Sequence, residues 1–210
     1  MLVTYGGKSL SITLELGPAL EATPLHLLPV FRLTDEEFWE VCRRNPQHKI
    51  ERSATGEIII MPPASSEGSS KNADLIADLV IWARQDGTGI VFESSGGFLL
   101  PSGAKRSPDA AWIARARWEG LNAAQRRRFA PLCPDFVVEL MLPSDRLAEA
   151  QAKMDEYLTN GIRLGWLIDG DNRTVYVYRP GQPVEELTDP ASVSGAPELP
   201  GFVLNLARIF

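Results

Sequence analysis

The sequence predicts a mixed α/β domain of the α+β type, in which helices flank a mixed and strongly bent β-sheet. Short runs rich in Val, Ile and Leu have the length of strands, and several are joined by short glycine-containing turns, as in hairpins. Longer segments with helical periodicity separate other runs. The chain has 210 residues, 44% of them hydrophobic, which is enough for one domain with a substantial core.

The first third of the chain predicts strands around one short helix. Residues 9–16 alternate apolar with polar side chains, which is typical of a half-buried strand, and the proline-containing residues 17–30 are expected to form an extended arm. Thr34 and Glu37 have the spacing of a capping box, so we expect a helix over residues 35–44. A hairpin should follow, with strands at residues 49–52 and 57–61.

The middle of the chain predicts a long helix over residues 70–86, because Leu75, Leu79 and Trp82 form an apolar stripe and Gly87 follows as a stop. Strands are then expected around Gly96-Gly97, and a helix-like insert separates two further strands. In chain order, these elements are strands at residues 90–93 and 98–100, the strand that begins at Asp109, the insert over residues 117–129, and the strand at residues 136–140.

Beyond residue 140, Ser144 is placed to cap a helix over residues 145–160, which Gly161 ends. The buried stripe of this helix should consist of Leu147, Ala150, Met154, Tyr157 and Leu158. Strands at residues 165–169 and 174–178 follow, joined by a turn. The sequence shows no internal repeat and no boundary of a second domain.

Two carboxylates fall within segments whose composition predicts buried strands. Asp109 opens the run Asp-Ala-Ala-Trp-Ile, and Glu139 lies inside Phe-Val-Val-Glu-Leu. An acid buried in a strand costs free energy unless something pairs with it. Two such acids on neighbouring strands can share a divalent cation, since Mg²⁺ prefers oxygen ligands and often binds one or two carboxylates. The pair therefore indicates metal-assisted cleavage of a phosphodiester.

Alternation along the second strand places Asp135, Val137, Glu139 and Met141 on one face. Asp135 belongs to a second Pro-Asp pair, but it shares a strand with Glu139 and so cannot be the acid of the neighbouring strand. We interpret it as the entry to the strand.

The order Pro-Asp, followed by acid-x-Lys on the next strand, is the signature of the PD-(D/E)xK nuclease superfamily. Here Met141 stands where the lysine is usual. Lys153, on the following helix, flanks the buried stripe and is a candidate substitute, because its long side chain can extend toward the metal face. A lysine there would orient or deprotonate the attacking water and stabilise the developing negative charge.

A set of short segments, specific in their order and spacing, carries a closer resemblance over residues 34–180. They are residues 56–63, 106–113 (Arg-Ser-Pro-Asp-Ala-Ala-Trp-Ile), 134–140 (Pro-Asp-Phe-Val-Val-Glu-Leu), 143–146 (Pro-Ser-Asp-Arg), 153–157 (Lys-Met-Asp-Glu-Tyr), 160–161 (Asn-Gly), 165–169 (Gly-Trp-Leu-Ile-Asp) and 175–179 (Val-Tyr-Val-Tyr-Arg). In these segments the chain resembles the Uma-type "putative restriction endonuclease" family, a branch of the PD-(D/E)xK superfamily.

The resemblance implies a restriction-endonuclease-like core over residues 34–180. An N-terminal strand and arm over residues 1–33 would precede it, and a tail over residues 181–210 would pack on it, all within one domain. It implies Asp109 and Glu139 as ligands of Mg²⁺, with Mn²⁺ as an alternative, and Lys153 as the migrated catalytic lysine. Glu67 is the nearest match to an acid that often joins such sites from the first core helix.

The implied partner is nucleic acid, in the form of double-stranded DNA. We expect a homodimer, because cutting both strands of a duplex is simplest with two sites. A catalytically inactive nucleic-acid-binding or regulatory protein on the same fold is the main alternative, and Met141 favours it. A third possibility is a structural or protein-interaction domain in which the acids are incidental.

Each candidate residue also has a plainer interpretation. A Pro-Asp pair is often the start of a strand, and Lys153 can be a solvated helix residue paired with Glu149 or Glu156. Glu67 can be a helix-start acid favoured by the helix dipole. The arginines at positions 126–128 would normally form a solvated helix face, and they would contact phosphates only if they lay beside the site.

Composition excludes some functions and favours one compartment. The net charge of −6 argues against nonspecific coating of nucleic acid, for which backbone affinity comes from Lys and Arg. Cys42 and Cys133 form no CxxC motif, and His26 and His48 are the only histidines, so a zinc site or a Cys-His catalytic pair is not expected. With neither a signal peptide nor an apolar stretch of about 20 residues, the sequence predicts a cytoplasmic protein with no membrane span.

Overall fold

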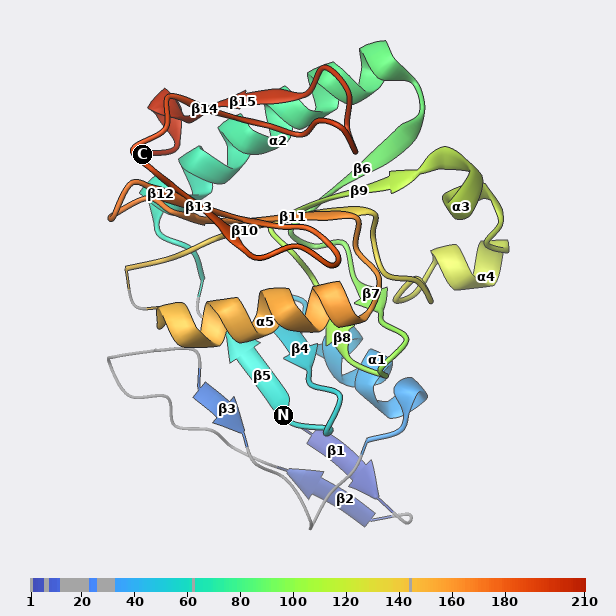
Figure 1. The fold of residues 1–210 in the computed structure, drawn as a ribbon. Coiled ribbons are helices and arrows are strands. Elements are labelled where there is room, and N and C mark those ends of the chain that lie inside the picture. Colours follow the sequence, from blue (N-terminus) through green and yellow to red (C-terminus); the bar gives the residue numbers. More distant parts are fainter. Residues whose placement is uncertain (1, 6–7, 12–22, 26–32, 62, 144) are drawn as a thin grey trace.

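The computed structural model describes residues 2–5, 8–11, 23–25, 33–61, 63–143 and 145–210. A six-stranded sheet lies at the centre of the structure (Figure 1). Its order is β13 (Glu185–Thr188), β12 (Thr174–Tyr178), β11 (Leu164–Asp169), β10 (Phe136–Leu140), β9 (Ala110–Ala114) and β6 (Gly89–Glu93). Strands β10 and β11 are parallel and all other neighbours are antiparallel, which confirms the predicted mixed sheet.

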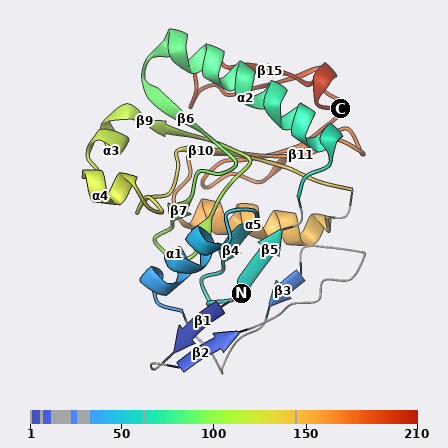
Figure 2. The ribbon, with the colours of Figure 1, turned by 180° about the vertical axis from the view of Figure 1, so that it is seen from behind.

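Two sets of elements cover the two faces of this sheet. Helix α2 (Ser66–Asp86) and the antiparallel pair β14 (Ser192–Ser194) and β15 (Val203–Asn205) lie on one face, as both views show (Figures 1 and 2). Helix α5 (Leu147–Thr159) connects the parallel strands β10 and β11 and covers the other face. Such a crossover is required because parallel neighbours cannot be joined by a tight hairpin.

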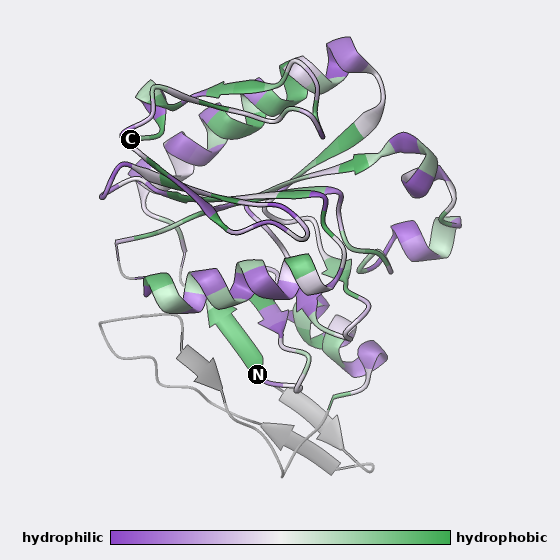
Figure 3. Ribbon diagram, viewed as in Figure 1, coloured by the Kyte–Doolittle hydropathy of each residue, from purple (hydrophilic) through white to green (hydrophobic). Residues whose placement is uncertain are grey.

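A second sheet of five strands lies on the far side of α5 from the central sheet. Its order is β3 (Thr23–Leu25), β5 (Ile58–Met61), β4 (Lys49–Arg52), β8 (Lys105–Arg106) and β7 (Phe98–Leu99). Helix α1 (Asp35–Arg44) packs on it through Phe38 and Val41, which form a small core with Ile50 and Ile58. Helix α5 is amphipathic and alternates hydrophobic with hydrophilic residues along its length (Figure 3), so it carries both an apolar stripe and a polar one.

The remaining elements are short. They are the antiparallel pair β1 (Leu2–Tyr5) and β2 (Lys8–Ser11), the helices α3 (Arg115–Glu119) and α4 (Ala123–Arg126), and the 3₁₀ helix η1 (Leu206–Arg208). In the part of the chain that the structure describes, no helix has both the length and the apolar character needed to cross a membrane.

Two hydrophobic clusters sandwich the central sheet. The first joins α2 and the C-terminal residues to Phe136, Val138 and Trp166, and the rings of Trp166 and Phe202 stack at 5.5 Å. The second joins α5 to Val137 and other residues of the opposite face. The residues of β10 therefore alternate between the two clusters, as the sequence pattern predicts.

The C-terminal residues pack against the first cluster. Trp82 of α2 donates a hydrogen bond from Nε1 to the carbonyl oxygen of Pro200 at 3.0 Å, and its ring lies 5.3 Å from that of Phe202. Strand β13 also extends the central sheet by pairing with β12. The last thirty residues thus complete one face of the sheet rather than projecting from it.

Several predicted elements are confirmed and others have shifted ends. The capping box of α1 is present, with the amide of Thr34 donating to Glu37 Oε2 at 2.8 Å. Helix α2 begins four residues earlier than predicted, because Ser65 caps it by accepting from the amide of Gly68 at 3.0 Å. Helix α5 begins at Leu147 after Arg146, which makes no side-chain cap, and the expected cap Ser144 lies outside the described residues.

Three further predictions differ from the structure in detail or lie partly outside the described residues. The strands around Gly96-Gly97 exist but belong to different sheets, since β6 joins the central sheet and β7 joins the second. The predicted insert consists of two short helices, α3 and α4. The strand predicted over residues 9–16 is represented by β2 and the arm by β3, while residues 12–22 and 26–32 lie outside the described part of the chain.

A glycine at the edge of the central sheet provides a stability test. A Cβ at Gly89 would lie 2.1 Å from Cε2 of Trp112, whose side chain is buried. Gly89→Ala should therefore lower the free energy of unfolding by about 1–3 kcal/mol, measured by urea denaturation. Gly120→Ala is the control, because a Cβ there meets only ordinary contacts at 3.4 Å or more. Equal stability of Gly89→Ala and wild type would contradict the close contact between Gly89 and the Trp112 ring.

Candidate active site

The pairing of β9 and β10 brings the two predicted acids together. In this antiparallel pair Val138 lies opposite Ala110, so one further step along the register sets Glu139 opposite Asp109. The amide of Leu140 donates to Asp109 Oδ2 at 2.9 Å and fixes that carboxylate at the end of the pair. The acids thus occupy facing positions on neighbouring strands, as the sequence predicts.

Both acids open into a cavity of about 730 Å³. The cavity lies at the N-terminal ends of α2 and α5, beside the C-terminal ends of β10 and β11, and strands β4 and β5 close it from the second sheet. All four residues singled out in the sequence, Glu67, Asp109, Glu139 and Lys153, line it. This end of the molecule lies opposite to α3 and α4 in Figure 1.

Glu139 is held by two side chains of α5. The ammonium of Lys153 lies 2.8 Å from Glu139 Oε1, and the hydroxyl of Tyr157 donates to the same oxygen at 2.9 Å. Lys153 and Tyr157 are four residues apart and therefore project from the same side of the helix. Burial raises the pKa of the Glu139 carboxyl; the Lys153 ammonium opposes this rise and the Asp109 carboxylate adds to it.

Asp109 is paired with a lysine that the sequence reasoning did not single out. Lys49 Nζ, from β4 of the second sheet, lies 3.0 Å from Asp109 Oδ1. The two acids are thus each matched by one ammonium, Asp109 by Lys49 and Glu139 by Lys153.

A third carboxylate, Glu51, lies beside the pair and is only 1% exposed. Its Oε1 accepts from Lys153 Nζ at 3.2 Å and from the amide of Ser107 at 2.8 Å, while its Oε2 accepts from Arg106 at 3.0 Å. Burial by itself would raise the pKa of this carboxyl, but Lys153, Arg106 and Lys49 together lower it to about 2. Glu51 is therefore ionised at neutral pH.

One feature of the sequence pointed weakly to Glu51. It is an acid in a predicted strand, but that strand reads Lys-Ile-Glu-Arg, and three charged residues out of four do not predict burial of the acid. The sequence also did not show which residue would pair with Glu51, because β4 belongs to the second sheet and meets α5 only in the folded protein.

Four charged residues form an ion-pair chain, defined here as Glu156, Arg106, Glu51 and Lys153 in that order. Arg106 Nε lies 2.5 Å from Glu156 Oε2, and both ends of the chain, Glu156 and Lys153, come from α5. The ion-pair chain therefore joins α5 to β4 and to β8. The Glu139 and Glu51 carboxylates more than offset burial and raise the pKa of Lys153, so this amine stays protonated.

The other sequence candidates lie apart from the acid pair. Glu67 is in the first turn of α2 at the rim of the cavity, with its side chain 78% exposed, and it pairs with Lys71 at 3.0 Å. None of the interactions described for it reaches Asp109 or Glu139. Asp135 stands just before β10, where it pairs with Arg117 at 2.8 Å and accepts from the amide of Ala114, consistent with its interpretation as a strand entry.

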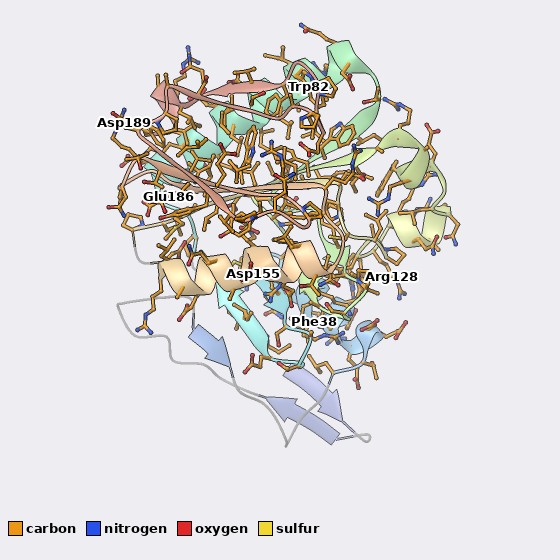
Figure 4. All side chains as sticks on the ribbon, in the orientation of Figure 1. Phe38, Trp82, Arg128, Asp155, Glu186 and Asp189 are labelled. Carbon is orange, nitrogen blue, oxygen red and sulfur yellow. The ribbon has the colours of Figure 1, made fainter. Side chains whose placement is uncertain are left out.

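The three consecutive arginines do not lie beside the site, so the structure gives no support to a phosphate contact there. Arg126 stacks over Trp118, and Arg128 pairs with Glu36 at 3.4 Å. Figure 4 shows Arg128 on the α4 side of the molecule, and none of the three arginines lines the cavity. The plainer interpretation, a solvated face, therefore describes them.

The donor set fits a hard divalent cation. Within the described residues, no three His, Cys, Asp or Glu side chains are gathered closely enough to hold a metal ion by themselves. Mg²⁺ does not require three, since it often uses one or two carboxylates together with water and substrate phosphate. Asp109 and Glu139 are the residues that would hold it.

Comparison with known proteins first identifies the class of fold. A crystal structure at 1.96 Å of "a putative nuclease belonging to DUF820", from Anabaena variabilis ATCC 29413, matches with a TM-score of 0.71. The match has 21% sequence identity and covers 85% of this chain and 97% of that one. The two proteins therefore share a fold.

The sequence comparison then gives the family. The model of the Uma2 family, described as "Putative restriction endonuclease", matches residues 35–207, and the chain belongs to this family. The match confirms the resemblance found in the sequence and extends it through most of the C-terminal residues. Among curated proteins, no sequence matches this chain.

The contact between Tyr157 and Glu139 predicts a measurable stability. A hydrogen bond to a charged group contributes roughly 1.5–3 kcal/mol, so Tyr157→Phe should lower the free energy of unfolding in urea by this amount. Tyr178→Phe is a matched control: Tyr178 is equally buried, and its hydroxyl makes no hydrogen bond to any residue that the structure describes. Equal losses in the two variants would show that the hydroxyl of Tyr157 has no special role.

Proposed function

We propose that the protein is a Mg²⁺-dependent endonuclease that hydrolyses phosphodiester bonds in double-stranded DNA. One observation carries the proposal: Asp109 and Glu139 face one cavity from neighbouring strands, with the Lys153 ammonium 2.8 Å from Glu139. Membership of a family described as "Putative restriction endonuclease" supports the reaction class. The metal, the DNA substrate and the role of the lysine are our proposal.

The excess of acidic side chains in the cavity supports the proposal that a cation binds there. Among the described residues that line it, five are Lys or Arg and eight are Asp or Glu. A phosphodiester is itself an anion, and like charges repel at short range. When bound, Mg²⁺ supplies neutralising charge at the scissile phosphate and a lowered pKa for an attacking water. Asp109 and Glu139 would bind it and fix its place in the cavity.

The geometry favours one of the two roles considered for Lys153. A protonated ammonium cannot accept a proton, and Glu51, which lies 3.2 Å from this amine and is not a proposed metal ligand, raises the pKa of Lys153. Lys153 would therefore orient the attacking water and stabilise negative charge on the phosphate instead of acting as a base. Its long side chain reaches Glu139 from α5, which supplies an amine near the position where Met141 has none.

The alternative function is an inactive nucleic-acid-binding or regulatory protein on the same fold. Met141 favours it, since this side chain packs among the hydrophobic residues next to α5 at the position of the usual lysine. Both functions allow a cation to bind at Asp109 and Glu139. They differ because only the enzyme cleaves nucleic acid.

Three finer points complete the proposal. We expect a homodimer that cuts the two strands of a duplex with two sites, and Mn²⁺ as a substitute for Mg²⁺. We also place the protein in the cytoplasm, where its two free thiols, Cys42 and Cys133, would remain reduced.

The metal assignment predicts which variants lose cation binding. Asp109→Asn and Glu139→Gln should each abolish the binding of Mg²⁺ or Mn²⁺ measured by calorimetry, because each removes one of the two carboxylate ligands. Asp155→Asn is the control: it removes the same charge from an exposed position of α5 outside the cavity (Figure 4). Retention of wild-type affinity by either ligand variant would refute the assignment.

The lysine assignment predicts a defect in rate without a defect in metal binding. Lys153→Ala should lower the rate of DNA cleavage by roughly 10²–10⁴-fold, the range for a positioned catalytic group, while calorimetric Mn²⁺ affinity persists. Arg163→Ala, which removes a positive charge from an exposed position away from the cavity, should cleave like wild type. The double variant Lys153→Met/Met141→Lys should regain part of the activity.

Two results would argue against this assignment. Equal cleavage by Lys153→Ala and wild type would exclude a catalytic role for Lys153. Metal binding by the wild type without cleavage of duplex DNA, single-stranded DNA or RNA would favour the inactive alternative.

A further inference from the structure

The amine of Lys153 has two carboxylate partners, and only one of them is a proposed metal ligand. Lys153 Nζ lies 2.8 Å from Glu139 Oε1 and 3.2 Å from Glu51 Oε1. Glu139 comes from the central sheet and Glu51 comes from the second. The ammonium therefore lies between the two sheets, with one acid on each side.

Glu51 is itself rigidly placed. Its side chain is buried, and it accepts hydrogen bonds from Arg106 at 3.0 Å and from the backbone amide of Ser107 at 2.8 Å. Ser107 stands two residues before Asp109, so the same carboxylate also fixes the segment that leads into the other proposed ligand. A carboxylate with this many fixed donors is a preorganised acceptor for an ammonium.

Binding of a cation would weaken the contact of Lys153 with Glu139 but not its contact with Glu51. A divalent cation held by Glu139 competes with the Lys153 ammonium for the same carboxylate, and the ammonium is then repelled by the cation. Without a second partner the long lysine side chain would regain its rotamer freedom and leave the site. Glu51 lies outside the proposed ligand pair and can keep its contact.

We propose that Glu51 is a positioning residue, which retains Lys153 beside the reacting phosphate when a divalent cation takes Glu139. The inference rests on the proposed nuclease function and adds to it a role for the second sheet. Glu51 would touch neither substrate nor cation and would act only through Lys153. Glu156 is the natural control, because it belongs to the same ion-pair chain but its described contact is to Arg106 and not to Lys153.

A double-mutant cycle tests whether Glu51 acts through Lys153. Glu51→Gln should lower the rate constant of DNA cleavage by about tenfold or more, within the range of coupling between contacting residues, with Mn²⁺ affinity retained. In a Lys153→Ala background the same substitution should have no further effect. Glu156→Gln should change the rate by the same factor in both backgrounds. A Glu51→Gln loss that is equally large without Lys153 would show a purely structural role and overturn the proposal.

A second measurement needs neither cleavage nor metal. Glu139→Gln mimics the loss of the Glu139 charge to a cation. The side-chain ammonium signal of Lys153 in NMR, assigned by its absence in Lys153→Arg, is visible only when its protons are bonded and exchange slowly with water. It should persist in Glu139→Gln and vanish in Glu51→Gln/Glu139→Gln. Loss already in the single variant, or persistence in the double variant, would refute the positioning role.

The two experiments separate the two proposals. If the wild type cleaves no nucleic acid, the nuclease proposal fails, while the NMR signal still decides whether Glu51 holds Lys153. Should Glu51→Gln fail to fold because Arg106 is left buried with less compensation, Glu51→Met/Arg106→Met removes both charges together, and the same NMR comparison is then made in that background.

Discussion

Compensation of buried carboxylates by ammonium and guanidinium groups is the constraint on which this structure depends. Glu51 and Glu139 are both nearly inaccessible to water, and an isolated buried carboxylate is strongly unfavourable. The protein meets this constraint with Lys153, which contacts both acids, and with Arg106, which contacts Glu51. None of these groups could be buried alone. They are buried only as a set, and the set requires that β4, β8, β10 and α5 converge.

This convergence explains the role of α5. One side of the helix packs Met154 and Tyr157 into the hydrophobic cluster under the central sheet. Glu156 and Lys153 make ionic contacts to the second sheet, and Lys153 also contacts Glu139 of the central sheet. The helix therefore joins the two sheets, and the cavity lies where they meet. The second sheet is therefore part of the site and not merely a support for it.

The charges around the proposed ligands also suggest how the site behaves without metal. Asp109 is matched by Lys49 and Glu139 by Lys153, so the four groups are neutral as a set. A divalent cation would make the same set positive, which favours an anionic phosphodiester. The two lysines thus compensate the charges of the two acids when no cation is bound. Met141 makes the position two residues after Glu139 apolar, yet the amine of Lys153 reaches Glu139 from the following helix.

The sequence by itself predicted most of the strands and helices and the alternation along β10, because these follow from local periodicity. It also singled out Asp109, Glu139 and Lys153 as candidates, whereas the facing positions of the two acids depend on the pairing of β9 with β10, which the structure shows. Only the tertiary structure decided that Glu51, Lys49 and Arg106 belong to the site and that the arginine run near α4 does not. Local patterns specify which residues share a face, whereas the docking of one face on another depends on packing and charge compensation between segments more than fifty residues apart in the chain.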